Sequence, residues 1–424
     1  MVTVVRADRL VDGSGRPPVD RPVVVVDDGS IAQIFGGRVP DGAVPDDATV
    51  LDYTGCTLLP GLIDAHVHTN LPGNGSTFER LIENQDGFLV ASSAAAVRTS
   101  LESGITTVRD LGGRHDTTFE VRRALRAGVG RGSRMLLAGQ PMTVTGGHCW
   151  YFGGEADGVD GVRAKVRELV KAGADWIKVI GSGGGTPNTI SHRPSFRREE
   201  VAAIADEAHR FDRRVTVHCL CAEAMEYAVD AGVDGIEHAS FLVDETQSQE
   251  YAPDVAERIA KAGIPVTTTL AVGHDIVANV SVRPQLSRSE QDYLDRWRRM
   301  RDDNLAQFAK LCDIGVQFIA GTDAGWRFTT FDSLPTEVWL MGEAGMSPTD
   351  AIASCTGRSA EVLGIGSETG RVAQGLTADL LAVAGDPLSD LRQLTDVRLV
   401  MQAGVVRVAD GCATRERHVS ERPA

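Results

Sequence analysis

The side chains that could do chemistry in this chain begin with two histidines separated by one residue. His66 and His68 flank Val67 in an apolar run that is typical of a β-strand. Because side chains alternate along a strand, both imidazoles point to the same face, where they can bind one divalent metal ion. Taken alone, the pair is explained equally well as two packed histidines, so further ligands decide the interpretation.

Three more donors stand in or just after apolar, strand-like runs. His218, His238 and Asp323 each have an ordinary explanation, a packed neutral histidine or a helix N-cap. If the runs are parallel strands of one barrel, these side chains converge with His66 and His68 at the carboxyl ends of the strands. Nitrogen and carboxylate donors in such a set suit zinc or a related divalent ion and leave positions for water.

Lys178 is an unusual residue for its surroundings. Only five of the 43 basic residues are lysines, yet this one lies between Ile177 and Val179 in an apolar run. The residue types allow three explanations: a carboxylated lysine that bridges two metal ions, a Schiff-base lysine, or an ion-pair partner of Asp323. The metal ligands expected around it favour the bridge.

Eight apolar runs alternate with helical patterns and must position these side chains. The helical patterns cover 162–174, 198–211, 221–233 and 253–264, and each ends at or near a glycine or a similar stop signal. Near-continuous apolar strands between helices predict an α/β protein with a (β/α)8 TIM barrel rather than an open sheet. The strand-like runs span 57–68, 105–112, 134–142, 175–184, 214–220, 235–241, 265–272 and 317–325.

Both ends of the chain read as β-strands without intervening helices, which predicts a small β-sandwich built from both chain ends. We expect residues 1–56 and 368–424 to form this domain and 57–367 to form the barrel. Two long segments, 69–104 and 273–310, follow the first and seventh barrel strands. Loops at that end of a barrel surround the active site, so both are candidate lids.

Composition excludes several classes of partner. The 58 acidic and 43 basic residues give a net charge of -15, which argues against nucleic acid and anionic membranes. The start of the chain does not resemble a signal peptide, and no apolar stretch approaches about 18 residues. Seven cysteines without a paired CxxC indicate neither a disulfide framework nor a zinc ribbon. We expect a cytoplasmic homo-oligomer that acts on a small molecule.

Several motifs, taken in order, resemble the amidohydrolase superfamily over nearly the whole chain. They are PGLIDAHVH, IKVIGSGG, VTVHC, IEHAS, AGTDAG and the terminal TADLLAVAGDP. Their combination is similar to the binuclear branch that contains imidazolonepropionase-like proteins and metal-dependent Xaa-Pro dipeptidases or carboxypeptidases. The resemblance implies two divalent ions, zinc in the first instance. It places His66, His68 and Asp323 on the more buried ion, His218 and His238 on the more exposed ion, and carboxylated Lys178 between the two.

The resemblance also implies hydrolysis of an amide-type C–N bond in a peptide, N-acyl amino acid, aryl amide, urea or carbamate. The two ions would generate hydroxide at neutral pH, and Asp323 would accept its proton and pass it to the leaving nitrogen. His148, in the run TGGHCW, matches a histidine that supports the developing oxyanion in related enzymes. Its alternative explanation is a loop histidine without a role.

Three positions depart from the pattern of related dipeptidases. Leu220 stands where those enzymes often have a tyrosine that binds the substrate carboxylate, which favours a more apolar substrate. Trp326 and Arg327 stand where relatives more often have small residues, and they could stack on an aromatic group and pair with a carboxylate. Packing and surface charge explain them equally well. The glycines of 181–185 lack the ending of a phosphate loop, so we expect them to make room for backbone near the metals.

Two other functions compete with hydrolysis. A mononuclear deaminase of the same superfamily needs no lysine ligand and uses a glutamate as proton shuttle. Glu237 adjoins His238, but strand alternation predicts that it points to the opposite face. A non-catalytic barrel scaffold predicts missing ligands, and the chain retains all six.

Overall fold

The computed structural model describes residues 2–37, 39–76 and 79–414, and both ends of the chain meet in one sheet. Strand β5 joins them, because it pairs in parallel with β1 and antiparallel with β13. The strands occur in the order β16-β15-β14-β13-β5-β1-β3-β4, with β2 paired to β1. Their bounds are β1 Thr3–Leu10, β2 Val19–Asp20, β3 Pro22–Asp27, β4 Ser30–Gly36, β5 Thr49–Pro60, β13 Leu380–Ala384, β14 Val397–Gln402, β15 Val405–Ala409 and β16 Cys412–Ala413.

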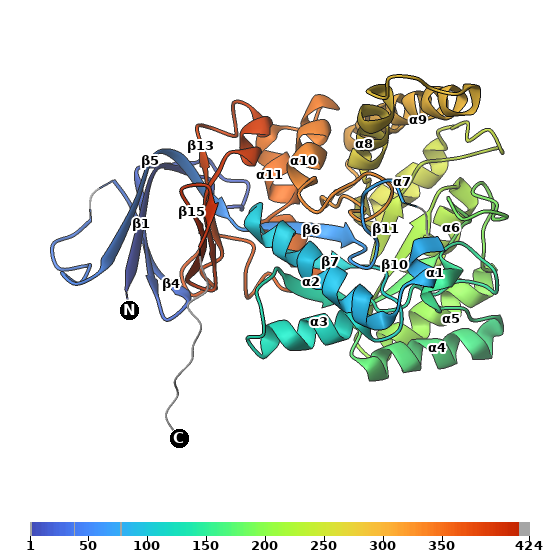
Figure 1. Ribbon diagram of the computed structural model, residues 1–424, viewed down its shortest axis with the longest axis horizontal. Helices are drawn as coiled ribbons and strands as arrows, with labels where there is room; N and C mark the ends of the chain where they lie inside the picture. The colour runs from blue at the N-terminus through green and yellow to red at the C-terminus, as the bar shows by residue number, and fades with distance from the viewer. Residues whose placement is uncertain (1, 38, 77–78, 415–424) are drawn as a thin grey trace.

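This nine-stranded sheet lies to one side of the α/β part of the molecule (Figure 1). Its interior is aliphatic, with Val5, Val24, Leu58, Leu380 and Leu399 all buried in one cluster. Residues from both ends of the chain contribute to this cluster, so neither end could bury its apolar face without the other. The strands expected at the two ends therefore form a single hydrogen-bonded unit.

The α/β part contains two parallel sheets, and most residues of their strands are buried. Isolated parallel bridges join Met142 to Val179, Val266 to Phe318 and Val67 to Ala324. The first two bridges join segments that follow each other in chain order, and the third joins the first of the parallel strands to the last segment. One sheet contains β6 Leu62–Val67, β7 Ile105–Asp110 and β8 Arg134–Leu137, and the other contains β9 Trp176–Ile180, β10 Arg214–Cys219, β11 Gly235–His238 and β12 Val266–Thr267.

Amphipathic helices connect the parallel strands. Helix α4 buries Val162, Val166 and Leu169, which are spaced for one face of a helix. Helices α4, α6 and α7 each end at a glycine in the left-handed conformation, as the sequence predicts. The connecting helices are α2 Asp86–Glu102, α3 Thr117–Arg126, α4 Gly158–Ala172, α5 Arg198–His209, α6 Ala222–Ala231 and α7 Pro253–Ala262.

The remaining helices lie in the longer connections and near the end of the α/β part. They are α1 Glu79–Glu83, α8 Leu270–Ser281, α9 Arg288–Asp313, α10 Leu334–Glu343, α11 Pro348–Ser354 and α12 Gly357–Leu363, with short 3-10 helices at Trp150–Phe152 and Leu391–Thr395. No helix within the described ranges combines the length and apolarity needed to cross a membrane.

Three expected strands differ from the structure. The run 57–68 divides at Gly61, because β5 continues to Pro60 in the nine-stranded sheet and β6 begins at Leu62 in the parallel one. The run 265–272 gives only the short β12, since Thr269 adopts a φ of 54° and α8 starts at the next residue. The run 317–325 forms isolated bridges instead of a regular strand.

The two long segments also have distinct structures. Segment 69–104 contains α2, which packs on β7 and α3, so much of it is an ordinary connecting helix. The Ala- and Ser-rich sequence of α2 has no clear apolar face, so the sequence pattern did not predict this helix. Segment 273–310 lies in the pair α8 and α9, which pack on each other (Figure 1). Helix α9 starts at a capping box formed by Ser287 and Glu290.

Candidate metal centre

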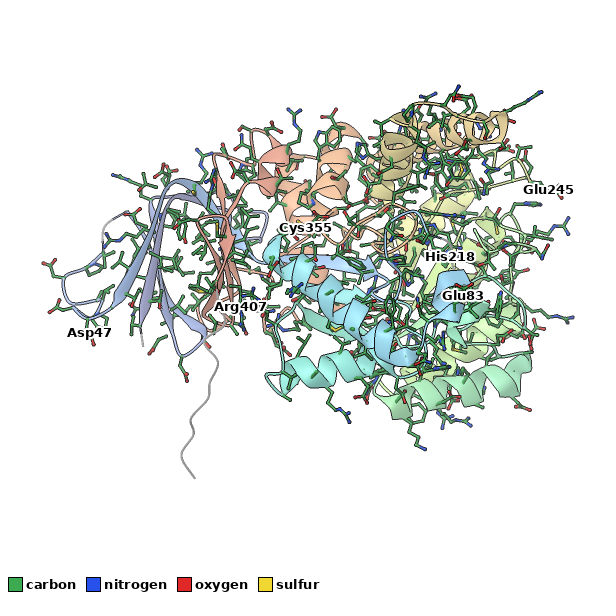
Figure 2. All side chains as sticks on the ribbon, in the orientation of Figure 1. Asp47, Glu83, His218, Glu245, Cys355 and Arg407 are labelled. Atoms are coloured by element: carbon green, nitrogen blue, oxygen red, sulfur yellow. The ribbon has the colours of Figure 1, made fainter. Side chains whose placement is uncertain are left out.

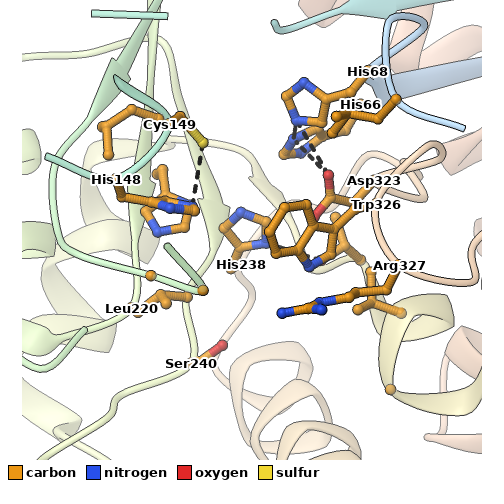
Figure 3. A pocket seen from close by; sticks show the side chains of 18 of the residues that line it. His66, His68, His148, Cys149, Leu220, His238, Ser240, Asp323, Trp326 and Arg327 are labelled. Carbon is orange, nitrogen blue, oxygen red and sulfur yellow. Dashed lines mark hydrogen bonds and ion pairs between the residues drawn. The ribbon is translucent and has the colours of Figure 1, made fainter. Parts of the chain in front are cut away.

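The six predicted ligands line one pocket, which is open to solvent. Figure 2 locates His218 in the α/β part, and Figure 3 shows the pocket from close by. The six ligands come from β6 and the residue that follows it, from β9, β10 and β11, and from the segment after Phe318. Residues far apart in the sequence therefore meet here. The ligands are His66, His68, Lys178, His218, His238 and Asp323.

Asp323 faces His66 in β6 and His68 just after this strand. Its Oδ1 lies 3.2 Å from His68 Nε2 and 3.6 Å from His66 Nε2, and the two Nε2 atoms are 3.3 Å apart. The backbone fixes this arrangement, because Asp323 N donates to His66 O at 2.8 Å. Asp323 has a φ of 59°, a left-handed conformation that non-glycine residues adopt at a cost. The structure therefore holds this carboxylate in a conformation directed at the histidines.

His238 and His218 approach from the neighbouring strands. The ring centre of His238 lies 5.2 Å from that of His66 and 4.6 Å from that of His218. His238 Nδ1 lies 2.9 Å from Thr269 Oγ1, which fixes the ring and leaves Nε2 for another partner. One potential ligand atom from each of His66, His238 and Asp323 lies within 4.8 Å of the others. These residues can hold one ion with limited rearrangement.

Lys178 lies in the middle of β9 and is 1% exposed. Burial is the main cause that lowers the pKa of its amine below the ordinary lysine value. A lowered pKa increases the neutral, nucleophilic fraction of an amine. The structure thus places an amine with this chemistry in the same pocket as the imidazoles.

The protonation states suit a divalent metal ion. Burial lowers the pKa of His66 to about 4 and that of His238 to about 3, and it lowers the pKa of His218 well below the usual value. Neutral imidazole is the form that binds metals. Burial alone would raise the pKa of Asp323, but the facing His66 and His68 imidazoles outweigh it and keep the carboxylate ionised. The donors present therefore fit zinc or a similar ion.

Glu237 supports His66 from beneath the site, contrary to the expected orientation. Its Oε2 lies 2.9 Å from His66 Nδ1, and its Oε1 accepts hydrogen bonds from Arg109 at 2.8 Å and from Thr216. Strand alternation ends here because the next residue, His238, has a φ of 72°. Burial would raise the pKa of Glu237, but Arg109 and His66 hold it well below its usual range. This carboxylate is ionised and fully engaged.

His148 lines the opposite side of the pocket from His66 and His68 (Figure 3). Its Nδ1 lies 2.7 Å from Thr186 Oγ1, and its Nε2 lies 3.4 Å from the Cys149 thiol. Burial lowers the pKa of His148 to about 3, so the ring is neutral. Because a thiol is a weak hydrogen-bond partner, a proton on Nε2 is available to a ligand.

The other pocket walls contain the three residues that depart from the dipeptidase pattern. Leu220, Trp326 and Arg327 all line the cavity, together with Ser240 at its lower side (Figure 3). Two glycines of the segment 181–185 allow His148 and Trp326 to lie close to the backbone. A Cβ at Gly185 would lie 2.7 Å from Trp326, and one at Gly184 would lie 2.5 Å from His148.

Sequence reasoning missed Arg109, which binds Glu237 beneath the pocket, and a group of residues that line the pocket. Like Lys178, Arg109 is a basic residue inside a predicted barrel strand, and this position was the signal available in the sequence. Trp297, Met300 and Asn304 line the pocket, from one face of α9. Their spacing of three and four residues is visible in the sequence, but nothing in it indicates which element that face contacts.

Comparison with known proteins agrees with this arrangement. The model of the amidohydrolase family matches residues 57–407. Ochratoxinase from Aspergillus niger is 27% identical over 444 residues, covering 94% of this chain and 84% of that protein. A Xaa-Pro dipeptidase crystallised with methionine in its active site gives a TM-score of 0.83 and 28% identity, covering 96% of this chain and 99% of the other.

A prolidase complexed with N-methylphosphonate-L-proline has a TM-score of 0.82 and 25% identity, covering 97% of this chain and 100% of the other. The relatives cover at least 94% of this chain, and the range of the family match contains the pocket described above. The chain therefore belongs to the amidohydrolase family and is an enzyme that acts on carbon–nitrogen bonds.

Proposed function

We propose that this enzyme hydrolyses an amide bond with a binuclear metal centre, with zinc as the first candidate. The main support for this proposal is that neutral imidazoles and one ionised carboxylate converge in a single buried site. His66, His68 and Asp323 would hold one ion, and His218 and His238 the other. Two divalent cations bound there supply Lewis-acid polarisation of a carbonyl and acidify water.

Lys178 is the proposed bridge between the two ions. Its neutral amine adds to the carbon of carbon dioxide, forming an N–C bond and releasing one proton to give an anionic carbamate. The buried position on β9 and the lowered pKa of the amine support this step. In a site that already contains several neutral nitrogen donors, the carbamate adds the negative charge that two cations require.

Asp323 and His148 have separate roles in the proposed reaction. Asp323 accepts a proton from the attacking water and later donates it to the leaving nitrogen. His148, across the pocket, donates a hydrogen bond from Nε2 to the carbonyl oxygen as negative charge develops there. The contact between its Nδ1 and Thr186 supports this role, because a hydroxyl that donates to Nδ1 leaves the proton on Nε2.

Two observations favour hydrolysis over deamination. Glu237, the glutamate beside His238, already binds Arg109, Thr216 and His66, so it is not free to shuttle protons. The mononuclear alternative also gives no reason to bury an amine among the ligands. We therefore assign the leaving group as an amine from an amide, urea or carbamate.

We also propose that the parallel strands close into a (β/α)8 barrel over 57–367, with 1–56 and 368–424 forming a small β-sandwich. The bridges Met142–Val179, Val266–Phe318 and Val67–Ala324 support closure, because they connect the strands in a ring. The chain passes from one part to the other at Gly61, because β5 pairs with β13 up to Pro60 and β6 begins at Leu62.

The test is a hydrolysis screen with zinc-loaded protein against an N-acyl amino acid, a dipeptide, an aryl amide and a phenylurea. We expect turnover of at least one substrate and its loss by about 10²-fold or more in Asp323→Asn. Lys165→Ala is a matched control for Lys178→Ala, since Lys165 pairs with Glu168 on α4. Turnover by none of the substrates, or full activity in Asp323→Asn, overturns the proposal.

A further inference from the structure

Arg327 brings a cation into the wall of the pocket. Among the side chains that the structure describes, no carboxylate lies within ion-pair distance of its guanidinium. Its guanidinium carbon lies 5.1 Å from the centre of the Trp326 ring. Other arginines nearby differ, because Arg283 pairs with Glu290 and Arg298 pairs with Asp295.

The loop that carries Arg327 is fixed to the metal site. Trp326 N donates to Asp323 O at 3.0 Å, and Thr329 N donates to Trp326 O at 3.0 Å. Arg327 itself has a φ of 53°, and its carbonyl accepts a hydrogen bond from Gly75 N. A left-handed conformation is unfavourable for a non-glycine residue, and the surrounding hydrogen bonds maintain it here. The cation therefore has a defined position relative to Asp323.

The pocket provides no anion of its own for this cation. Among the described residues that line it, Asp323 is the single carboxylate, and it faces His66 and His68. A guanidinium binds a carboxylate with two parallel hydrogen bonds, a geometry that neutral groups cannot match.

Apolar side chains form part of the wall of the pocket that Arg327 also lines. Leu220, Val272, Trp297 and Met300 line the pocket from three different segments. Figure 3 shows the Arg327 guanidinium directed toward the side where Leu220 and Ser240 lie. A ligand that fills this space combines a carboxylate with a large apolar or aromatic group.

We infer that Arg327, stacked on Trp326, binds the carboxylate of the substrate. Within the proposed function, on which this inference rests, the preferred substrates are N-acyl amino acids with large apolar side chains. Neutral aryl amides and ureas lack the group that Arg327 recognises. The missing tyrosine at Leu220 is thereby compensated by a cation from a different loop.

Binding of two small ligands tests the subsite without any turnover. The zinc-loaded protein is titrated with 3-phenylpropionate and with 3-phenylpropanamide, and binding is followed by calorimetry. We expect the carboxylate to bind about 10- to 100-fold more tightly, as for a charged hydrogen bond, and Arg327→Gln to abolish that preference. Arg327→Lys retains part of it, and Arg298→Met, which removes a cation from α9 outside the pocket, leaves it unchanged. A preference that persists in Arg327→Gln overturns the inference.

Kinetics then separate this inference from the proposed function. The substrates are N-benzoyl-phenylalanine and N-benzoyl-phenylalaninol, which share the same amide and differ in the carboxylate. We expect a higher kcat/KM for the acid, lost in Arg327→Gln. Equal kcat/KM values for the two in the native protein overturn the Arg327 assignment and leave hydrolysis standing. Hydrolysis of neither, together with Arg327-dependent binding of phenylpropionate, overturns the proposed function and leaves the carboxylate subsite standing.

Discussion

His66 Nδ1 lies 2.9 Å from Glu237 Oε2, and Arg109 donates a hydrogen bond to the other oxygen of the same carboxyl group. Because Glu237 is ionised and buried, it fixes the proton of His66 on Nδ1 and leaves Nε2 directed at Asp323 and His68. Carboxylates that orient a metal-binding histidine in this way also raise its basicity. Through this pair, Arg109 on β7 is linked to a proposed metal ligand of the pocket.

Replacement of Glu237 by Gln is expected to weaken zinc binding about 10- to 100-fold, because His66 loses its charged partner. Competition with a chelator measures the change. Glu207→Gln is the matched control, since Glu207 pairs with Arg163 and Arg167 on helices far from the pocket. Zinc affinity equal to that of the native protein in Glu237→Gln would contradict the role assigned to this pair.

His148→Ala is expected to lower kcat by about 10²- to 10³-fold, the cost of removing one oxyanion donor. Metal content should not change, because His148 is not among the proposed ligands. His115→Ala serves as a control, since His115 is an exposed histidine paired with Asp86. A kcat within threefold of the native value in His148→Ala removes this residue from the mechanism.

Gly184→Ala is expected to displace His148 and lower kcat. The added Cβ would lie 2.5 Å from His148 Cδ2 and 2.6 Å from Nε2, closer than real Cβ contacts allow. If displacement of His148 is the cause, adding Gly184→Ala to His148→Ala causes no further loss of kcat. The control Gly161→Ala, where a Cβ meets open space, should retain activity. Additive losses in the double variant would point to another effect of the glycine.

Glu337 gives the fold a pH dependence that a single substitution removes. Burial raises its pKa from 4.5 to about 8, although Ala271 N donates to it at 2.6 Å. Between these values the native state holds a proton that the unfolded chain releases. Its contribution to stability is therefore fully present below about pH 4.5 and is lost as pH rises toward about 8, by up to about 1.4 kcal/mol per pH unit.

Glu337→Gln mimics the protonated form at every pH. The free energy of unfolding of this variant should rise relative to the native protein as pH increases from 5.5 to 7.5, measured by urea denaturation. Glu343→Gln, on the exposed side of the same helix, should show no such trend. A constant difference across this range would mean that Glu337 is ionised in the native state.

The connecting helices could be predicted from the sequence because local signals define them. Helices α4 to α7 start and end near their predicted limits, since amphipathic spacing and terminal glycines depend on neighbouring residues. The seventh and eighth strands could not, because Thr269 and Asp323 adopt positive φ values that the surrounding structure imposes. Single-sequence patterns contain no signal for such strained positions.

The candidate site could also be predicted only where local sequence patterns define it. Alternation around Val67 gave the shared face of His66 and His68, and the structure brings them together. The contact between His66 and Glu237 joins residues 171 positions apart, so it depends on the register of β11 within the whole molecule. The α9 side chains line the pocket through tertiary packing, which likewise cannot be predicted from local sequence patterns.

Metal stoichiometry tests the central claim most directly. The protein is stripped with a chelator, reloaded with zinc, freed of excess metal and analysed by elemental mass spectrometry, beside Lys178→Ala prepared in the same way. We predict two zinc ions per native chain and one or fewer per Lys178→Ala chain, because the bridge holds both ions. One zinc ion per chain in both proteins would contradict a binuclear centre bridged by Lys178.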